Sequence, residues 1–148
     1  MISFFYETKF KLNQIRLWKL WIKQCVEAEN YKVGDLNYIF CDDEYLLQIN
    51  REYLNHDYYT DVIGFQYSDG KELAGDIYIS IERIAENAKE NRVKFHQELA
   101  RVMIHGVLHF MNYRDKSEKE AKKMRELENK YIELLPEINA NVPRGTSI

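Results

Sequence analysis

The sequence predicts an α+β protein of a single domain, with a mixed sheet of about four strands and about five helices. Two patterns and the chain length predict this class. Short runs in which apolar residues alternate with polar ones are typical of strands, and longer segments with apolar residues every three or four positions are typical of helices. The 148 residues are enough for one hydrophobic core and too few for two.

The first three elements are expected to be a strand, a helix and a second strand. Residues 2–6 alternate like a strand, and residues 12–29 have the apolar spacing of a helix. The apolar face of this helix carries Ile15, Trp18, Ile22 and either Cys25 or Val26. Gly34 then precedes the second strand, residues 36–40.

A second helix and a hairpin follow. Asp42 is the expected N-cap of the helix, because its carboxylate can accept a hydrogen bond from the first turn. The side of this helix expected to be buried carries Leu46, Ile49 and Tyr53. Residues 60–67 and 75–79 alternate like strands, and residues 68–71 have the composition of a turn. We therefore expect an antiparallel hairpin over residues 62–79.

Three further helices complete the predicted domain. Ser80 is the expected N-cap of the first. Its apolar face carries Ile81, Ile84, Ala85 and Ala88. Residues 96–111 are strongly apolar and predict the central, buried helix. Ser117 and Glu120 form a capping box for the last helix. Its apolar stripe carries Ala121, Met124, Leu127 and Tyr131.

We expect one domain over residues 1–138 and a loose polar tail over residues 139–148.

Composition and charge disfavour several classes of protein. The net charge of −3 disfavours a general nucleic-acid-binding protein, since that binding normally relies on a basic surface, but it does not exclude a local basic groove. We expect no DNA partner. Cys25 and Cys41 lie outside any CxxC spacing, so we expect no disulfide and a reducing compartment. Because no signal peptide or apolar run of roughly 20 residues is present, we expect a cytoplasmic protein without a membrane partner.

His105 and His109 lie four residues apart in the predicted central helix. This spacing places both imidazoles on one helix face, one turn apart, so that both can bind one metal ion. Asn112 is a good helix terminator, and beyond it the chain can turn back so that Asp115 supplies a third ligand. Two imidazoles and one carboxylate leave a fourth position open, as in catalytic zinc sites. The sequence therefore predicts one divalent metal ion per chain, with zinc as the first choice.

Histidines four apart are, taken alone, more often two packed or exposed side chains than a metal site. Here both lie in an apolar run, where an unpaired imidazole would cost about 1–3 kcal/mol. Gly106 lies between them, although glycine in a helix interior costs about 1 kcal/mol relative to alanine. Either a neighbouring element or a substrate must therefore approach this backbone closely. Gly106 also occupies the position at which helical zinc peptidases of the HExxH type carry their general base, which disfavours a peptidase.

Three segments of the chain form a series of motifs. Residues 49–65 read INREYLNHDYYTDVIGF, residues 75–77 read GDI, and residues 105–115 read HGVLHFMNYRD. In this order they resemble the LNxxYRxxDxPTDVLSF, GDI and HGxLHxxGYxH patterns of the YbeY family of metal-dependent endoribonucleases, also called rRNA maturation factors. The resemblance covers residues 35–135 of the chain. It implies that the metal ligands lie on a zincin-like central helix.

Three of the departures from these family patterns bear on function. Asp115 stands where the family usually has a third histidine, and this harder ligand makes manganese, iron or nickel more competitive with zinc. Asn112 replaces a glycine and tolerates the left-handed conformation of a helix end. Leu54 replaces an arginine associated with RNA handling, for which Arg51 or His56 are candidate substitutes.

The resemblance implies a single-strand-specific endoribonuclease that acts on rRNA of the small ribosomal subunit, in rRNA maturation and ribosome quality control. The metal ion would polarise a phosphoryl oxygen, and basic side chains would hold the flanking phosphates. Arg101 lies one turn before His105 on the same helix face, so we expect it to join His105 and His109 in the catalytic set by contacting phosphate. The alternative for Arg101 is a salt bridge with a neighbouring acid such as Glu98.

Two charged segments have both a structural and a functional interpretation. The basic segment is either a solvated helix face or an RNA-facing strip, and it contains Arg83, Lys89, Arg92 and Lys94. Residues 116–130 alternate in charge sign and predict an exposed helix face.

Two other functions remain open at this point. One is a ribosome-assembly factor without catalytic activity, whose metal is structural. The other is a zincin-like hydrolase of peptides or small molecules, which Gly106 disfavours. Metal-dependent cleavage of RNA distinguishes the endoribonuclease from both.

Overall fold

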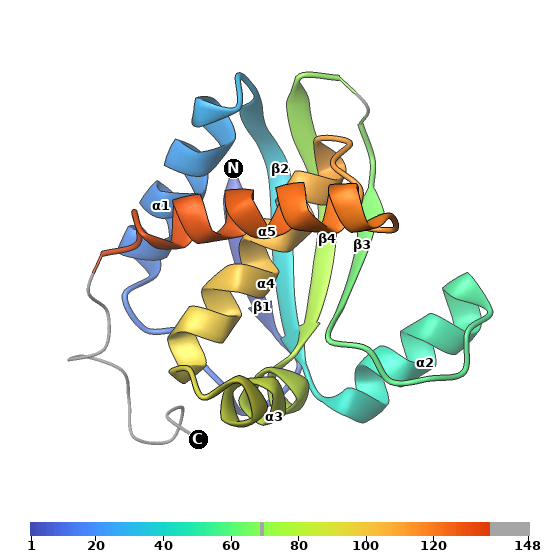
Figure 1. The fold of residues 1–148 in the computed structure, drawn as a ribbon. Coiled ribbons are helices and arrows are strands. Elements are labelled where there is room, and N and C mark those ends of the chain that lie inside the picture. Colours follow the sequence, from blue (N-terminus) through green and yellow to red (C-terminus); the bar gives the residue numbers. More distant parts are fainter. Residues whose placement is uncertain (69, 137–148) are drawn as a thin grey trace.

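The computed structural model describes residues 1–68 and 70–136 (Figure 1). The expected tail, residues 139–148, lies outside the described residues. Within them the elements are, in chain order, β1 (Ile2–Tyr6), α1 (Ile15–Ala28), β2 (Lys32–Cys41), α2 (Asp43–Leu54), β3 (Val62–Gln66), β4 (Glu72–Ser80), α3 (Ile81–Asn91), α4 (Phe95–Phe110) and α5 (Glu118–Ile132).

The four strands form one mixed sheet in the order β1-β2-β4-β3. β2 lies parallel to both β1 and β4, with Tyr38 opposite Phe4 on one side and Ile77 on the other. β3 is antiparallel to β4, so the predicted hairpin is confirmed. The helices and the sheet together confirm the α+β class and the single domain.

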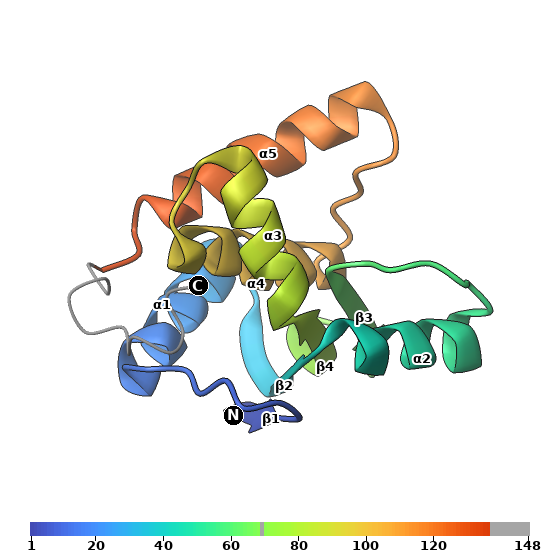
Figure 2. The ribbon, with the colours of Figure 1, turned by 90° about the horizontal axis from the view of Figure 1, so that it is seen from below.

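α4 packs against the sheet and is covered by α5 on its other side (Figure 2). Its sheet-facing residues are fully or nearly fully buried and include Val102, Met103, Val107 and Phe110. This burial confirms α4 as the central helix. No helix in the part of the chain that the structure describes is long and apolar enough to cross a membrane.

Three predicted N-caps are present. The side chains of Asp42, Ser80 and Ser117 accept hydrogen bonds from the backbone N–H groups of Tyr45, Arg83 and Glu120. Ser117 and Glu120 also make the reciprocal contact of a capping box. These local contacts define where α2, α3 and α5 begin.

Three residues predicted to lie on apolar helix faces are exposed instead. Ile15, the first residue of α1, is 38% exposed. Tyr53 is 69% exposed, because α2 buries a side centred on Leu46, Leu47 and Asn50. Ala121, in the first turn of α5, is exposed, whereas Met124, Leu127 and Tyr131 are buried as predicted.

Glycines let α4 approach the sheet closely. A Cβ atom on Gly106 would lie 2.9 Å from Cδ1 of Ile77 in β4. At the end of α4, the ring of Phe110 lies against Gly64 of β3 and Gly75 of β4, where added Cβ atoms would lie 3.0 and 2.8 Å from it. A neighbouring element, β4, therefore accounts for the glycine between the two histidines, and α4 is held at a fixed depth on the sheet.

Candidate metal centre

The outer face of α4 carries the predicted site residues. Arg101, His105 and His109 are spaced by four residues and so lie along one helix face. All three are only partly buried, whereas the residues between them are buried. The sheet thus fixes which face of α4 is available for chemistry.

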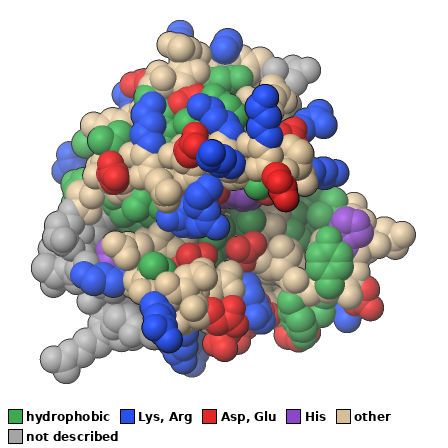
Figure 3. Space-filling model, in the orientation of Figure 1, with side chains coloured by type: hydrophobic (Ala, Val, Ile, Leu, Met, Phe, Trp, Pro, Cys, Tyr) green, Lys and Arg blue, Asp and Glu red, His purple; other side chains and the backbone are tan. Residues whose placement is uncertain are grey.

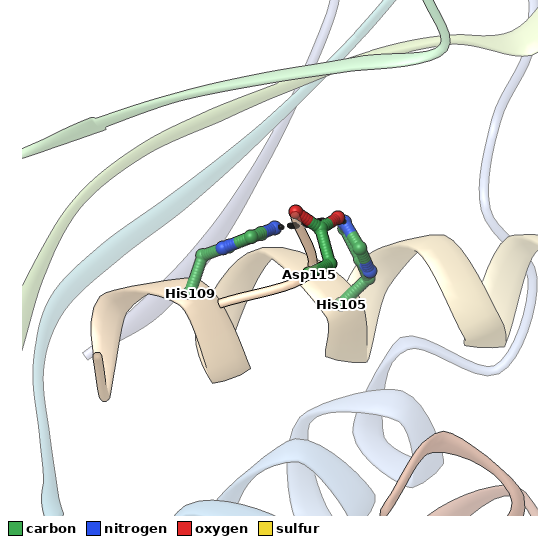
Figure 4. Close-up of side chains that lie close together, drawn as sticks. All are labelled: His105, His109 and Asp115. Atoms are coloured by element: carbon green, nitrogen blue, oxygen red, sulfur yellow. Dashed lines mark hydrogen bonds and ion pairs between the residues drawn. The ribbon is translucent and has the colours of Figure 1, made fainter. Parts of the chain in front are cut away.

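The chain turns back after α4 in the way the sequence predicted. Asn112 adopts the left-handed conformation, with φ of 72°. The backbone N–H of Tyr113 then donates to the carbonyl of Leu108, which closes the helix end as in a Schellman motif. The following residues bring Asp115 to the face that carries the histidines (Figure 4).

His105, His109 and Asp115 converge on one point (Figure 4). The Nε2 atoms of the two histidines lie 3.0 Å apart, and Oδ2 of Asp115 lies 3.5 Å from His105 Nε2 and 3.4 Å from His109 Nε2. Ligand atoms at usual bond lengths from one tetrahedral zinc ion lie roughly 3.3–3.6 Å apart. The donor types and their spacing therefore fit one divalent metal ion.

Glu128 of α5 is a further residue at this site. Its carboxylate is only 5% exposed and accepts a hydrogen bond from His105 Nδ1, at 2.7 Å. Burial by itself lowers the pKa of His105, but the hydrogen bond and charge of Glu128, with the charge of Asp115, outweigh it and raise the pKa. For Glu128 the hydrogen bonds from His105 and Arg101 outweigh burial and lower the pKa. Glu128 is therefore ionised and acts as an acceptor.

Arg101 is held by α5. Its Nη1 atom donates to Glu128 Oε1 at 2.9 Å, and its Nη2 atom donates to Asn129 Oδ1 at 2.8 Å. The ion pair is thus with Glu128 rather than with Glu98, the acid suggested from the sequence. The expected contact between Arg101 and a phosphate stays a prediction.

Sequence reasoning missed Glu128. The alternating charges of residues 116–130 predicted an exposed face, and this holds for the lysines and arginines of α5. Glu128, however, lies four residues after Met124 and three before Tyr131, so it falls on the buried stripe. A carboxylate on an apolar stripe is a signal that could have identified it, because buried acids are rare unless they are paired.

Leu54, which stands at the position of the family arginine, lies beside a hollow that is separate from the candidate metal centre. Leu54 lines a cavity of about 260 Å³ together with His56, Tyr58, Val62 and Gly64. Of the two candidate substitutes, Arg51 forms an ion pair with Asp57, whereas the ring of His56 stacks on Tyr58 within this hollow. Within the described residues, the group able to hold a metal consists of His105, His109 and Asp115, without His56 or His96.

Basic side chains lie along α5 beside the site. Figure 3 shows lysine and arginine side chains, with acidic ones between them, along α5 above a recess in which histidine is visible. In the basic segment predicted from the sequence, Arg83 is paired with Asp43 at 2.8 Å. Lys89, Arg92 and Lys94 are exposed.

Comparisons with known proteins agree with this arrangement. The family model described as Endoribonuclease YbeY matches residues 5–136. The Endoribonuclease YbeY of Flavobacterium psychrophilum is 52% identical over 134 residues, which cover 90% of this chain and 96% of that protein. The protein of the same name from Christiangramia forsetii is 50% identical over 133 residues, which cover 90% of this chain and 93% of that protein.

A solved structure shares the fold. The solution structure of TM1509 from Thermotoga maritima aligns with a TM-score of 0.66 and 30% sequence identity, covering 91% of this chain and 89% of that one. The family match spans the sheet, α4 and the three converging ligands, and the relatives are matched along almost their whole length. On these grounds the chain belongs to the YbeY endoribonuclease family.

Proposed function

We propose that the protein is a metal-dependent endoribonuclease that cleaves single-stranded RNA, with one zinc ion held by His105, His109 and Asp115. The observation that carries this proposal is the convergence of two imidazole nitrogens and a carboxylate oxygen within 3.5 Å of one another. The name of the relatives, Endoribonuclease YbeY, supplies the reaction class.

The ligand set supports zinc and leaves other metals competitive. Two imidazoles and one carboxylate are common in catalytic zinc sites, which keep a coordination position open. A carboxylate is a harder ligand than imidazole, so manganese, iron and nickel can also be accepted. All three side chains are partly accessible, with 24%, 37% and 39% of their surfaces exposed for His105, His109 and Asp115. A phosphodiester can therefore approach the centre.

A divalent ion bound here would supply the positive charge that stabilises the negative charge developing on a phosphate during cleavage. The residues of the chain would do the rest. His105 and His109 present their Nε2 atoms from the rigid helix α4, and Asp115 closes the site from the loop. Arg101 lies one turn before His105, and we propose that it contributes positive charge to phosphate binding. Lys89, Arg92 and Lys94 are exposed and can hold phosphates further along the strand.

We further propose that the substrate is rRNA of the small ribosomal subunit, cleaved during rRNA maturation and ribosome quality control in the cytoplasm. The support is the resemblance of the three sequence motifs and the two cysteines, which are both free and buried. Free thiols are usual in a reducing compartment.

The test is cleavage of a 5′-labelled single-stranded RNA by zinc-loaded protein, beside a His109→Ala variant purified identically. A matched His96→Ala variant is the control, because it removes another histidine of α4 that lies outside the ligand group. We expect cleavage by the wild type and by His96→Ala. We expect His109→Ala to lose activity at least 100-fold, which corresponds to about 2.7 kcal/mol of transition-state stabilisation.

Each other outcome supports a rival function. Equal traces of cleavage in all samples would indicate a contaminating nuclease and contradict the enzyme proposal. Metal binding without any RNA cleavage would favour a ribosome-assembly factor with a structural metal. Hydrolysis of a peptide or a small ester, without cleavage of RNA, would favour a zincin-like hydrolase.

A further inference from the structure

Glu128 is a buried acid whose two carboxylate oxygens have different partners. Oε2 faces His105 Nδ1 at 2.7 Å, and Oε1 accepts from Arg101 Nη1 at 2.9 Å. Its side chain is only 6% exposed, so both contacts are shielded from water. A charge in such a position is seldom retained unless it is fully paired, because desolvation is costly.

The contact with His105 determines which ring nitrogen carries the proton. An ionised carboxylate can only accept, so Nδ1 of His105 must be the donor. In the neutral imidazole the lone pair then lies on Nε2, and this is the atom that faces His109 and Asp115. Glu128 therefore selects the tautomer and the ring orientation that a metal ion at this centre requires.

Arg101 and Asn129 hold the carboxylate in turn. The guanidinium bridges Glu128 and the side chain of Asn129, its neighbour on α5. The resulting chain of contacts runs from α5 through Arg101 and Glu128 to His105. Through these contacts, the packing of α5 on α4 fixes the position of the His105 ring and therefore of its Nε2 atom.

We propose that Glu128 is a positioning residue of the metal centre, and that Arg101 acts through it by fixing its carboxylate. This inference rests on the proposed metal site and adds a residue to it. The competing interpretation is that Glu128 only clamps α5 onto α4. The two differ because a clamp affects the stability of the protein, whereas a positioning residue also affects the affinity for metal.

The experiment measures zinc affinity by competition with a chromophoric chelator at one pH, for the wild type, Glu128→Ala, Glu128→Gln and Met124→Ala. Met124 is the matched control, since it is a buried residue of α5 one turn before Glu128 and its apolar side chain carries no carboxylate to accept from His105. Loss of an outer hydrogen-bond partner typically weakens metal binding about 10- to 100-fold. We expect a loss of that size for Glu128→Ala. Partial rescue is expected in Glu128→Gln, whose amide oxygen can still accept from Nδ1. Met124→Ala should keep the affinity of the wild type while it unfolds more easily.

A spectroscopic readout makes the test independent of how well a variant folds. In the zinc-loaded wild type, ¹⁵N NMR of the imidazoles is expected to place the proton of His105 on Nδ1. A proton on Nε2 would overturn the inference, as would equal zinc affinities in the wild type and Glu128→Ala. If the wild type itself bound no metal, the proposed function would fail first, so the two failures are distinguishable.

Discussion

Asp115 is the proposed ligand at which this chain departs from the family pattern, and its carboxylate is expected to influence the metal preference. Its carboxylate oxygen lies 3.4–3.5 Å from both histidine Nε2 atoms, so it is placed to bind the same ion. Replacement of a hard oxygen by a nitrogen ligand favours zinc over manganese. We predict that Asp115→His raises the preference for zinc over manganese on the order of tenfold, which corresponds to about 1.4 kcal/mol.

Competition between the two ions for each protein, followed with a fluorescent chelator, checks this prediction. Asp57→His is a suitable control, because Asp57 lies in the α2–β3 loop and belongs to an exposed ion pair with Arg51. An unchanged preference in Asp115→His would mean that Asp115 does not bind the ion.

The two cysteines are core residues that are shielded from reagents. Cys25 and Cys41 are fully buried and unpaired, and burial raises the pKa of each thiol to about 12. Each thiol is therefore protonated at neutral pH, and the thiolate is the reactive form. We predict that neither cysteine reacts with a thiol reagent at pH 8 in the folded protein, and that both react at once in guanidinium. Rapid reaction of the native protein would contradict this prediction and show that the free energy of local unfolding around the cysteines is small.

Gly106 is explained by Ile77, and this can be tested with a pair of substitutions. Gly106→Ala gains about 1 kcal/mol of helix propensity but places a Cβ atom 2.9 Å from Cδ1 of the fully buried Ile77. Overpacking of this kind costs about 1–3 kcal/mol, so we expect a net loss of about 1 kcal/mol. In an Ile77→Val background the nearest atom is absent but Cγ2, at 3.1 Å, remains, so the loss should become smaller without disappearing. Urea unfolding of the wild type, Gly106→Ala, Ile77→Val and the double variant gives the coupling free energy between the two positions. An equal loss in both backgrounds would contradict the contact with Ile77.

The α4–α5 loop carries Asp115 and is anchored to the end of α1. The hydroxyl group of Tyr113 donates to Glu29 Oε1 at 2.7 Å, and the hydroxyl group of Tyr131 in α5 donates to the other oxygen of the same carboxylate. Glu29 therefore ties the loop and α5 together at a site two residues from the third ligand. The position of Asp115 depends on this anchor as well as on the end of α4.

We predict that Tyr113→Phe destabilises the protein by about 1 kcal/mol, the usual net contribution of such a hydrogen bond. It should also weaken zinc binding several-fold, because the loop that carries Asp115 is less restrained. Tyr59→Phe is the matched control. The hydroxyl group of Tyr59 donates to Glu44 in an exposed contact that lies outside the α4–α5 loop. Denaturant unfolding and zinc titration of both variants test the prediction. Equal zinc affinity in the two variants would show that the loop holds its position without Glu29.

The sheet order and the crossing of α4 by α5 build the site as one unit. α4 carries two of the proposed ligands, the following loop carries the third, and α5 carries the hydrogen-bond partner of His105. A metal ion bound to these residues contacts the folded state and not the unfolded chain, so it stabilises the whole domain. The stability of the protein should therefore depend on metal.

We predict that free zinc at about 100 times its dissociation constant raises the free energy of unfolding by about 2.7 kcal/mol. For a chain of this size the melting temperature should rise by roughly 5–11 °C. A chelator should reverse the shift, and His109→Ala should show none. Differential scanning calorimetry with and without zinc measures it. An equal shift in His109→Ala would place the bound metal elsewhere.

Local patterns in the sequence were sufficient to predict most of the elements and the three residues that converge in a group able to hold a metal ion. Asp42, Ser80 and Ser117 cap helices because each side chain reaches backbone groups within its own first turn. His105 and His109 share a face because the helix repeats every 3.6 residues. Asn112 ends α4 because its own backbone conformation is left-handed. These properties depend on neighbours in the chain, so spacing and residue type determine them.

Contacts between distant residues were decided only by the tertiary structure. Glu128 lies 23 residues from His105, and the crossing of α4 and α5 brings the two together. The same crossing gave Arg101 the partner Glu128 in place of the neighbouring Glu98. Gly106 could have made room for a substrate or for another element, and the packing of α4 on β4 placed Ile77 there. The sequence by itself determined which residues can bind a metal ion, whereas the packing of helices and sheet decided which residues hold them in place, because that packing joins side chains that no local spacing relates.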